Sequence, residues 1–398
     1  MQTMPDQPDR LNAFLDHSSA PVAHAGQGPL AGLTLAVKDI FDIEGQRTGC
    51  GNPQRLDEAA PAARTAPAVQ TLLGAGARFV GRTQTDELAF SLMGQNAHYP
   101  QPVNPAAPGR VTGGSSSGSA AAVAGGLADI GLGSDTGGSI RAPASFCGLI
   151  GLRTTHGAIP LDSAMPLASS LDTFGWFAKD GEIYERVGEI FFEGEGQLRR
   201  PFRLAALDEL LLGPPEAAEY GRMLAVVARI LGDVPVAAPL SQPVDDLYWC
   251  FRRIQAHEAW ASHGAWISAK DRGLGPGVKE RFEFGATIDR ATFDAETARR
   301  YAFREELAGH LGDDGLLVLP TVPGAAPLKD AAFDDLQAYR ERALRLLALS
   351  GLSGFPQITL PLGAVDGAPF GISLLGPSGS DLALIRLGRA ILDAARER

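Results

Sequence analysis

Cysteine is scarce in this sequence, with only Cys50, Cys147 and Cys250 among 398 residues. The three lie far apart, so the chain has no CxxC pair of the kind that binds zinc or carries out redox chemistry. So sparse and odd-numbered a set is also unlike the disulfide framework of a small secreted domain. We therefore expect reduced thiols and a cytoplasmic protein.

Long hydrophobic runs are missing as well. A membrane-spanning helix needs about 18 or more apolar residues in succession, and the most apolar stretch, 120–132, is interrupted by Gly125, Gly126 and Asp129. Residues 1–6 lack the basic and apolar segments of a signal peptide. We expect neither secretion nor a membrane partner.

Basic residues are in the minority. Lys and Arg total 35 against 46 for Asp and Glu, which gives a formal net charge of −11. A protein whose main partner is nucleic acid needs a basic face that neutralises phosphates, so this class is disfavoured. A small-molecule enzyme stays open, because 45% hydrophobic and 20% charged residues suit an ordinary globular protein with a sizeable core.

Short apolar β-rich segments alternate with helical patterns along the chain, which is typical of α/β folds. The predicted strands are 33–38, 78–81, 130–132, 316–320, 357–362 and 370–375. The predicted helices are 10–17, 66–77, 86–92, 120–127, 215–231, 247–270, 291–311, 336–349 and 381–395. Because no linker separates these elements cleanly, we predict one large α/β domain over residues 1–398, with a helical insertion.

A Gly- and Ser-rich loop, 113–119, follows a proline-rich stretch. Such a loop is most often a flexible linker or the start of a helix, for which Ser119 would supply the N-cap. The loop also fits the GxSxG pattern with Ser116 as a nucleophile, but that pattern needs a β-strand directly before it. Pro105 and Pro108 argue against a central strand there, so an α/β-hydrolase is disfavoured.

The cluster 135–141 has the sequence DTGGSIR and is open to two interpretations, a structural or phosphate-binding turn and a catalytic loop. Consecutive backbone N–H groups here can converge into a nest that stabilises an oxyanion. The donors would be Thr136, Gly137, Gly138 and Ser139. In the catalytic interpretation Ser139 is well placed as a nucleophile, and Asp135 and Arg141 are expected to form an ion pair that braces the loop.

Lys38 ends the apolar segment 33–38. Its simplest interpretation is an exposed lysine at a strand end, because lysine is almost never buried without a partner. In the alternative interpretation the amine is buried, its pKa falls, and it acts as a base near neutral pH.

Taken together, Lys38, the loop 113–119 and the cluster 135–144 resemble the amidase signature family. The likeness covers nearly the whole chain, being dense over 33–180 and weaker over 185–310. Further matching segments are 151–157, 170–175 and 354–369. The resemblance implies an α/β fold with a central mixed β-sheet flanked by helices. It divides the domain 1–398 into a signature core at 33–180, a helical substrate-side region at 185–310 and a C-terminal α/β part that completes the core at 311–398.

The resemblance also implies roles for particular residues. Ser139 would be the nucleophile, Ser115 a bridging serine held by a cis peptide bond, and Lys38 the base. The oxyanion-hole donors would be the backbone N–H groups of Thr136, Gly137, Gly138 and Ser139. Ala89 and Phe90 would lie beside the scissile group. Neither a metal nor a cofactor is implied.

The implied activity is hydrolysis of the C–N bond of a small primary amide to a carboxylate and ammonia through an acyl-enzyme. Segments 95–99, 104–108 and 273–277 are most similar to short amidases of the indole-acetamide hydrolase type, which makes an aryl or indole acetamide one candidate substrate. Ser117 stands where many members have Gly. The compact 185–310 region, which forms much of the acyl pocket in relatives, leaves the substrate open.

Two alternative functions stay open. The glutaminase subunit of a tRNA-dependent amidotransferase shares the signature, although the negative charge and short chain argue against it. Non-catalytic amidase-like domains also occur in chloroplast import receptors, but here Lys38, Ser115 and Ser139 are all present and no tetratricopeptide repeats follow. The expected partner is a small-molecule amide, and a homodimer is left open.

Overall fold

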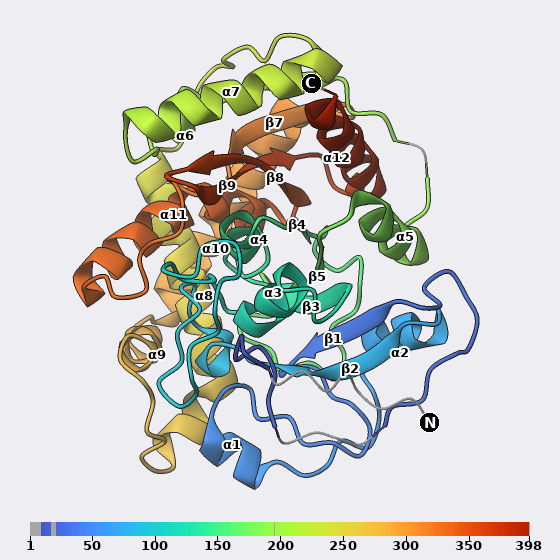
Figure 1. Ribbon diagram of the computed structural model, residues 1–398. Coiled ribbons are helices and arrows are strands. Elements are labelled where there is room, and N and C mark those ends of the chain that lie inside the picture. Colours follow the sequence, from blue (N-terminus) through green and yellow to red (C-terminus); the bar gives the residue numbers. More distant parts are fainter. Residues whose placement is uncertain (1–8, 17–20, 195, 398) are drawn as a thin grey trace.

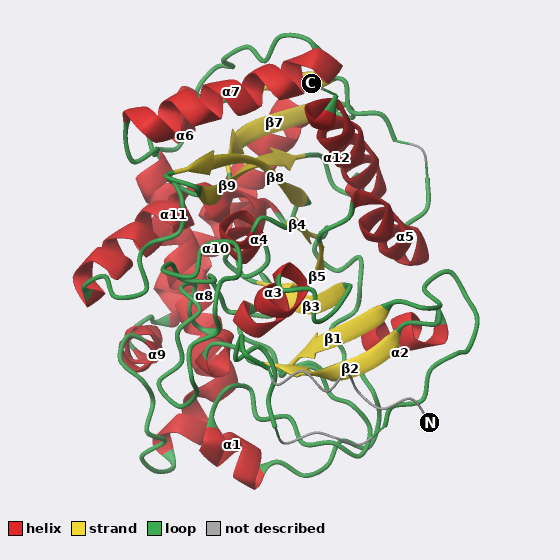
Figure 2. Ribbon diagram, in the orientation of Figure 1, coloured by secondary structure: helices red, strands yellow, loops and turns green. Residues whose placement is uncertain are grey.

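The strands of this protein form a single mixed β-sheet. The computed structural model describes residues 9–16, 21–194 and 196–397, and within them nine strands are joined in the order β2-β1-β3-β5-β4-β8-β9-β7-β6. They are β1 (Thr34–Lys38), β2 (Arg78–Thr83), β3 (Ile130–Asp135), β4 (Ile150–Arg153), β5 (Thr173–Ala178), β6 (Arg200–Phe202), β7 (Gly315–Pro320), β8 (Gln357–Val365) and β9 (Ala368–Leu375). Figure 2 shows the strands in the middle of the molecule and the helices outside them. The predicted α/β fold class is confirmed.

Helices cover the sheet on several sides. In the described residues they are α1 (Pro53–Glu58), α2 (Pro67–Gly74), α3 (Ser117–Ala124), α4 (Arg141–Cys147), α5 (Gly181–Phe191), α6 (Ala205–Asp208), α7 (Pro214–Leu231), α8 (Val244–Ser268), α9 (Val278–Ala286), α10 (Arg290–Leu311), α11 (Phe333–Ser353) and α12 (Asp381–Arg396). Figure 1 shows α8, α10 and α11 gathered on the left and α5 and α12 on the right. Among these helices, none has the length and hydropathy that crossing a membrane requires.

Strand β1 lies parallel to both of its neighbours, β2 and β3. In the pairing with β3, Leu35 is opposite Ile130 and Val37 is opposite Leu132. Parallel strands end at the same edge of a sheet. The end of β1 at Lys38 therefore lies beside the end of β3 at Asp135, although almost a hundred residues separate them in the chain.

Helix α3 packs directly on β3 because that strand carries glycine where the helix crosses it. A Cβ atom on Gly131 would lie 2.8 Å from the carbonyl oxygen of Ser119, and one on Gly133 would lie 2.4 Å from Ser116 Oγ. The Gly- and Ser-rich loop 113–119 thus leads into a helix that is held against the sheet. The many small residues of this region serve close helix–strand packing.

The C-terminal strands complete the sheet that the N-terminal strands begin. Strand β8 pairs antiparallel with β4, with Gly151 opposite Thr359, and β9 and β7 follow in the same sheet. Strand β6, from the largely helical region 185–310, adds to β7 at the edge. The three segments proposed for the domain thus all contribute to one sheet, and their exact division stays a prediction.

Two predicted helices are wrong. Residues 9–16 form turns, with an isolated bridge between Phe14 and Thr83, and His17 lies outside the described residues. Residues 86–92 contain only a 3₁₀ turn, η1 (Glu87–Ala89). Leu88 has φ 49° and Ala89 φ 56°, which a continuing α-helix excludes. The Leu88 N–H donates to the carbonyl of Cys50 instead, so a tertiary contact overrides the local helical preference.

Two helical glycines provide a matched test of this packing. Gly118 in α3 has no room for a methyl group, since an added Cβ would lie 2.3 Å from the Ala13 carbonyl oxygen and 2.5 Å from the Gln84 nitrogen. We expect Gly118→Ala to lower the free energy of unfolding by roughly 1–3 kcal/mol. Urea denaturation followed by circular dichroism measures this.

Gly221 in α7 is the control, because it is exposed and an added Cβ there meets nothing within 4 Å. Gly221→Ala should raise the free energy of unfolding by about 0.5–1 kcal/mol, since alanine is the better helix former. Equal effects of the two substitutions would contradict the close packing of α3.

Candidate active site

Lys38 is completely buried at the end of β1. Its Nζ lies 2.8 Å from Ser115 Oγ, 3.1 Å from Ser116 Oγ and 3.1 Å from Ser134 Oγ. The interpretation of Lys38 as an exposed lysine at a strand end is therefore wrong. The amine is enclosed by three hydroxyl groups, with no carboxylate in direct contact among the described residues.

Ser115 joins this lysine to the Gly-rich cluster. Its Oγ lies 2.8 Å from Lys38 Nζ on one side and 3.1 Å from Ser139 Oγ on the other. The peptide bond between Gly114 and Ser115 is cis, as the resemblance implied. Three side chains from β1, the loop before α3 and the loop after β3 thus form one hydrogen-bonded line.

Burial changes the charge of this lysine. Loss of solvation lowers the pKa of Lys38 from its usual 10.5 to about 7, against the opposing effect of the Asp86, Asp135 and Asp172 carboxylates, which raise it. Desolvation disfavours the charged form of an amine, and it is the largest effect here. The lowered pKa favours the neutral amine, which is the form that can accept a proton.

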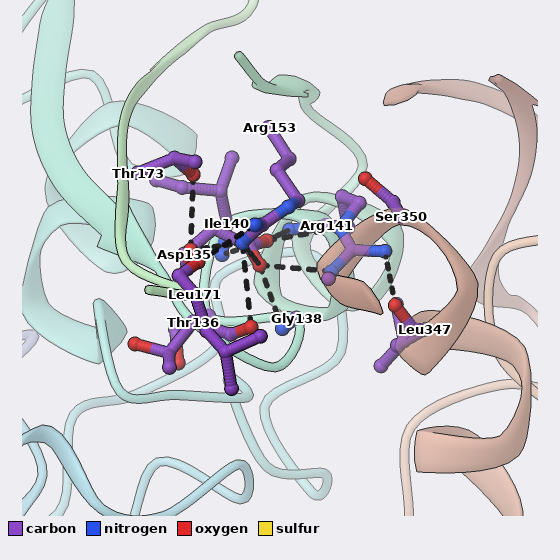
Figure 3. Close-up of polar contacts among 12 residues, drawn as sticks. Asp135, Thr136, Gly138, Ile140, Arg141, Arg153, Leu171, Thr173, Leu347 and Ser350 are labelled. Atoms are coloured by element: carbon purple, nitrogen blue, oxygen red, sulfur yellow. Dashed lines mark hydrogen bonds and ion pairs between the residues drawn. The ribbon is translucent and has the colours of Figure 1, made fainter. Parts of the chain in front are cut away.

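Asp135 fixes the shape of the Gly-rich cluster, as Figure 3 shows. Its carboxylate accepts hydrogen bonds from the backbone N–H groups of Gly138 and Ile140, at 2.8 and 3.1 Å. It also pairs with the guanidinium of Arg141 through Nε at 3.0 Å and Nη2 at 2.8 Å, which confirms the predicted ion pair. The loop that carries Ser139 is therefore tied to a fully buried charged pair.

Arg153 adds a second cation to Asp135. One of its Nη atoms contacts the Asp135 carboxylate at 3.3 Å and also the Asp135 carbonyl oxygen, while the other donates to the carbonyl of Leu171. Burial alone would raise the pKa of Asp135, but the adjacent Arg141 and Arg153 and the backbone donors bring it well below its usual range. The carboxylate stays ionised and keeps its contacts with the loop.

Of the four backbone N–H groups that the sequence suggested as oxyanion donors, one is already used in a hydrogen bond within the described chain. Gly138 N–H already donates to Asp135. No acceptor within the described ranges takes the N–H groups of Thr136, Gly137 or Ser139. Of the four donors that the sequence suggested, these three remain available to an oxygen atom of a ligand.

Two small cavities meet at this loop. One, of about 130 Å³, is bordered by Ser134 and Thr136 and has a mainly apolar wall. Its other lining residues are Ile40, Ala89, Leu161, Ala164, Met165, Pro166, Leu167, Ser169 and Asp172. The second is a narrow pocket lined by Ser139, Gly137, Ala89 and Phe90. The position of Ala89 and Phe90 beside the scissile group stays a prediction.

Sequence reasoning missed two members of the lysine cluster and misjudged one residue nearby. Ser134 and Ser116 both contact Lys38, and neither was assigned to it. The position of Ser134, directly before Asp135 at the end of β3, would have been informative once β3 was known to pair with β1. Ser119 does not cap α3, because it lies inside the helix and its hydroxyl donates to the carbonyl of Leu132.

The geometry of this site can be compared with known proteins. A family profile described as Amidase matches residues 2–185. A protein of Oryza sativa subsp. japonica named Amidase 1 is 38% identical over 94% of this chain and 93% of its own length. Amidase 1 of Arabidopsis thaliana is 39% identical over 95% of this chain and 97% of its own length. The chain belongs to the amidase signature family. It is an amidase.

Solved structures agree with this membership. A crystal structure of an amidase superposes with a TM-score of 0.82 at 30% identity, over 92% of this chain and 85% of its own. A protein from work on the evolutionary origins of an s-triazine catabolic enzyme gives a TM-score of 0.84 at 28% identity, with the same coverage. The mixed sheet with its surrounding helices is thus the fold of this family.

Removing the Asp135 charge should destabilise the amidase. Asp135→Asn leaves Arg141 and Arg153 buried without their counter-ion, and breaking a buried ion pair from one side costs about 3–5 kcal/mol. We expect a loss of that size in the free energy of unfolding, measured by urea denaturation. Asp314→Asn is the control, since Asp314 and its partner Arg200 are 48% and 54% exposed and such pairs contribute at most about 1 kcal/mol. Similar losses in both variants would contradict the bracing role of Asp135.

Proposed function

We propose that this amidase hydrolyses a small primary amide to a carboxylate and ammonia through an acyl-enzyme on Ser139. The observation that carries this proposal is the hydrogen-bonded line from the buried amine of Lys38 through Ser115 to Ser139, with steps of 2.8 and 3.1 Å. Both distances are within the reach that proton transfer between positioned groups requires.

The surroundings of Lys38 suit a neutral amine. A neutral amine has two N–H donors and one lone pair, and three hydroxyl groups surround the nitrogen. The Ser116 hydroxyl donates onward to the Ser134 carbonyl oxygen at 3.3 Å, so its oxygen is left to accept from Lys38. In the proposed reactive state the N–H groups point to Ser116 and Ser134, and the lone pair faces Ser115.

The first half of the proposed reaction acylates Ser139. Ser139 Oγ attacks the amide carbonyl while its proton passes to Ser115, whose own proton passes to Lys38. Negative charge then develops on the carbonyl oxygen. The N–H groups of Thr136, Gly137 and Ser139 are suited to receive it, because donors aimed at developing charge in a water-poor site contribute strongly to catalysis.

The second half returns the protons. The Lys38 ammonium protonates the leaving nitrogen through Ser115, which is necessary because an amide anion is a poor leaving group. Water, activated by the same relay, then hydrolyses the acyl-enzyme and frees Ser139. The relay starts and ends with neutral Lys38, so each turnover restores it.

The cavity beside Thr136 supports a small acyl group. Its volume of about 130 Å³ and its apolar lining resemble an engineered protein cavity of about 150 Å³ that accepts benzene. An uncharged part of the acyl group, up to about the size of a single aromatic ring, matches this volume. Several of its lining residues are aliphatic, which favours an uncharged portion of the substrate at this end.

Relatives with other functions define the competing proposals. A glutamyl-tRNA(Gln) amidotransferase subunit of Halobacterium salinarum is 31% identical over 96% of this chain and 99% of its own length. The translocon protein 64 of the chloroplast outer membrane in Pisum sativum is 34% identical over 90% of this chain but 65% of its own length. Ammonia release by the purified chain alone, across a panel of primary amides, separates our proposal from a partner-dependent glutaminase. Labelling of Ser139 by a fluorophosphonate separates it from a binding protein.

Substitution of the relay residues tests the mechanism directly. We expect Ser139→Ala and Lys38→Met each to lower kcat by at least about a thousandfold, with the double variant no worse than either, because members of one catalytic unit are strongly non-additive. Ammonia release under saturating amide measures this. Lys179→Met, at an exposed lysine after β5, is the matched control and should keep wild-type turnover. Independent, multiplicative losses in the double variant would argue against a shared relay.

The pH profile tests the charge state of the base. The pKa of Lys38 is lowered to about 7 by burial, and only the neutral amine accepts a proton. We therefore expect kcat/KM for an uncharged amide to fall about tenfold per pH unit below pH 7 and to level off above it. A profile that stays flat through pH 7, or that falls as pH rises, would show that an uncharged Lys38 is not the active form.

A further inference from the structure

The narrow pocket beside Ser139 has an unusual wall. Arg340 lines it together with Ser139 and Gln255, and the Arg340 side chain is 4% exposed. Its Nε is buried without a hydrogen-bond partner, as is Gln255 Oε1. Within the described residues Arg340 forms neither an ion pair nor a side-chain hydrogen bond, which is costly for a buried guanidinium.

Helix α11 explains why Arg340 points to this pocket. Its residues at positions 340, 344 and 347 share one face, because they follow the i, i+4, i+7 spacing of an α-helix. On this face Leu347 fills the space in front of Gly138 and Leu344 approaches Gly137. This face of α11 therefore packs against the loop that carries Ser139, and Arg340 on the same face lines the pocket.

Other positive charges reinforce that of Arg340. The guanidinium carbon of Arg281 lies 5.6 Å from the ring centre of Phe90, which borders the pocket. Arg281 is also buried, and its Nε has no partner. Burial, together with the charges of Arg281 and Arg252, lowers the pKa of Arg340 well below its ordinary value. Three arginines thus create a positive field in a protein whose formal net charge is −11.

The carboxylates of Asp86, Glu280 and Glu87 oppose part of this field, since they raise the pKa of Arg281. Within the described residues, none of them forms an ion pair with Arg281 or Arg340. Glu87 accepts hydrogen bonds from Asn52, His98 and the N–H of Gly275. Glu280 accepts from the N–H of Gly277 at the start of α9. A guanidinium stays protonated in proteins, and within the described residues Arg340 has no direct anionic partner, so an anion that enters the pocket would supply one.

We propose that the amide substrate carries a carboxylate, and that Arg340 binds this carboxylate beside Ser139. This inference rests on the proposed function, since it places the anionic group on the acyl part of the amide that Ser139 attacks. Arg340 supplies the planar fork of donors that suits a carboxylate. The pocket has a volume of about 10 Å³, room for one water-sized group, so a single carboxylate oxygen would occupy it beside Arg340.

The substrate class is therefore the monoamide of a dicarboxylic acid. The acyl carbon lies at Ser139 and the carboxylate at Arg340, and both border the same pocket. Binding such a group has a second benefit, because it gives a buried cation its missing partner. Neutral amides of the same length leave Arg340 unpaired and should be poorer substrates.

Hydrolysis of matched amides provides the test. The probes are the monoamides of malonate, succinate, glutarate and adipate, each paired with its uncharged diamide of equal length. We expect kcat/KM of the wild type to favour the best monoamide over its diamide, and Arg340→Met to lower that preference by roughly 30-fold or more, as loss of one partner of a buried charge pair does.

Two further variants keep the test decisive. Arg345→Met, on the same helix with its side chain paired to Asp245, should leave the preference unchanged. Arg340→Met should not unfold the chain, because it removes an uncompensated buried charge and replaces it with an apolar side chain of similar length. Urea denaturation checks this. A preference that is absent in the wild type, or that is equal in the wild type and Arg340→Met, overturns the inference while leaving the amidase proposal intact.

Binding separates the inference from the proposed chemistry. Calorimetric titration of Ser139→Ala with each monoamide, compared with the Ser139→Ala/Arg340→Met double variant, does not depend on turnover. Tighter binding of at least one monoamide than of its diamide, lost in the double variant, supports the carboxylate site even if no amide is hydrolysed. Equal affinities in both variants overturn the site even if hydrolysis is observed.

Discussion

The amidase depends on one interaction, the contact of a buried primary amine with three serine hydroxyls. At the end of β1, Lys38 exchanges contact with bulk water for hydrogen bonds to the hydroxyls of Ser115, Ser116 and Ser134, its side-chain partners among the described residues. No carboxylate among the described residues touches the amine, so burial can bring its pKa down to about 7. A direct ion pair would keep the amine protonated and remove its capacity to act as a base.

A different use of buried charge holds the neighbouring loop. Asp135 is as deeply buried as Lys38, but it is surrounded by Arg141, Arg153 and backbone donors and remains ionised. The paired charge sets the conformation of the loop, whereas the enclosed amine is the group proposed to react. Lys38 and Asp135 lie at the ends of the neighbouring parallel strands β1 and β3. The sheet therefore fixes the distance between the amine and the carboxylate.

Helix α11 connects this loop to the proposed specificity site. The same helix face supplies the Leu347 and Leu344 side chains that pack on Gly138 and Gly137, and the Arg340 guanidinium that borders the pocket of Ser139. Relatives with this fold include proteins named as amidases and as amidotransferase subunits. A shared fold does not determine the substrate. Different residues at positions such as 340 on this face of α11 would give family members different substrate specificities.

Many helices and strands could be predicted from the local sequence, because the spacing of apolar residues indicates which face of a strand or helix is buried. The strands β1, β7 and β9 and the long helices α7, α8 and α10 were predicted close to their observed bounds, whereas segment 130–132 covers only the first half of β3 and the strands β4, β5 and β6 were not predicted. Segment 86–92 was not, since Leu88 bonds to Cys50, which is distant in the chain. Local propensity carries no information about such a contact.

The sequence alone also identified the candidate residues Lys38, Ser115 and Ser139, because their types and spacing match a family pattern. Whether Lys38 was exposed or enclosed could not be read from neighbouring residues, since burial is a property of all the elements that surround a side chain. Pairing of β1 with β3 brought Ser134 to the amine, and packing of α11 brought Arg340 to Ser139. These two contacts join segments about 96 and 200 residues apart in the chain, and only the packed sheet and helices decide that they meet.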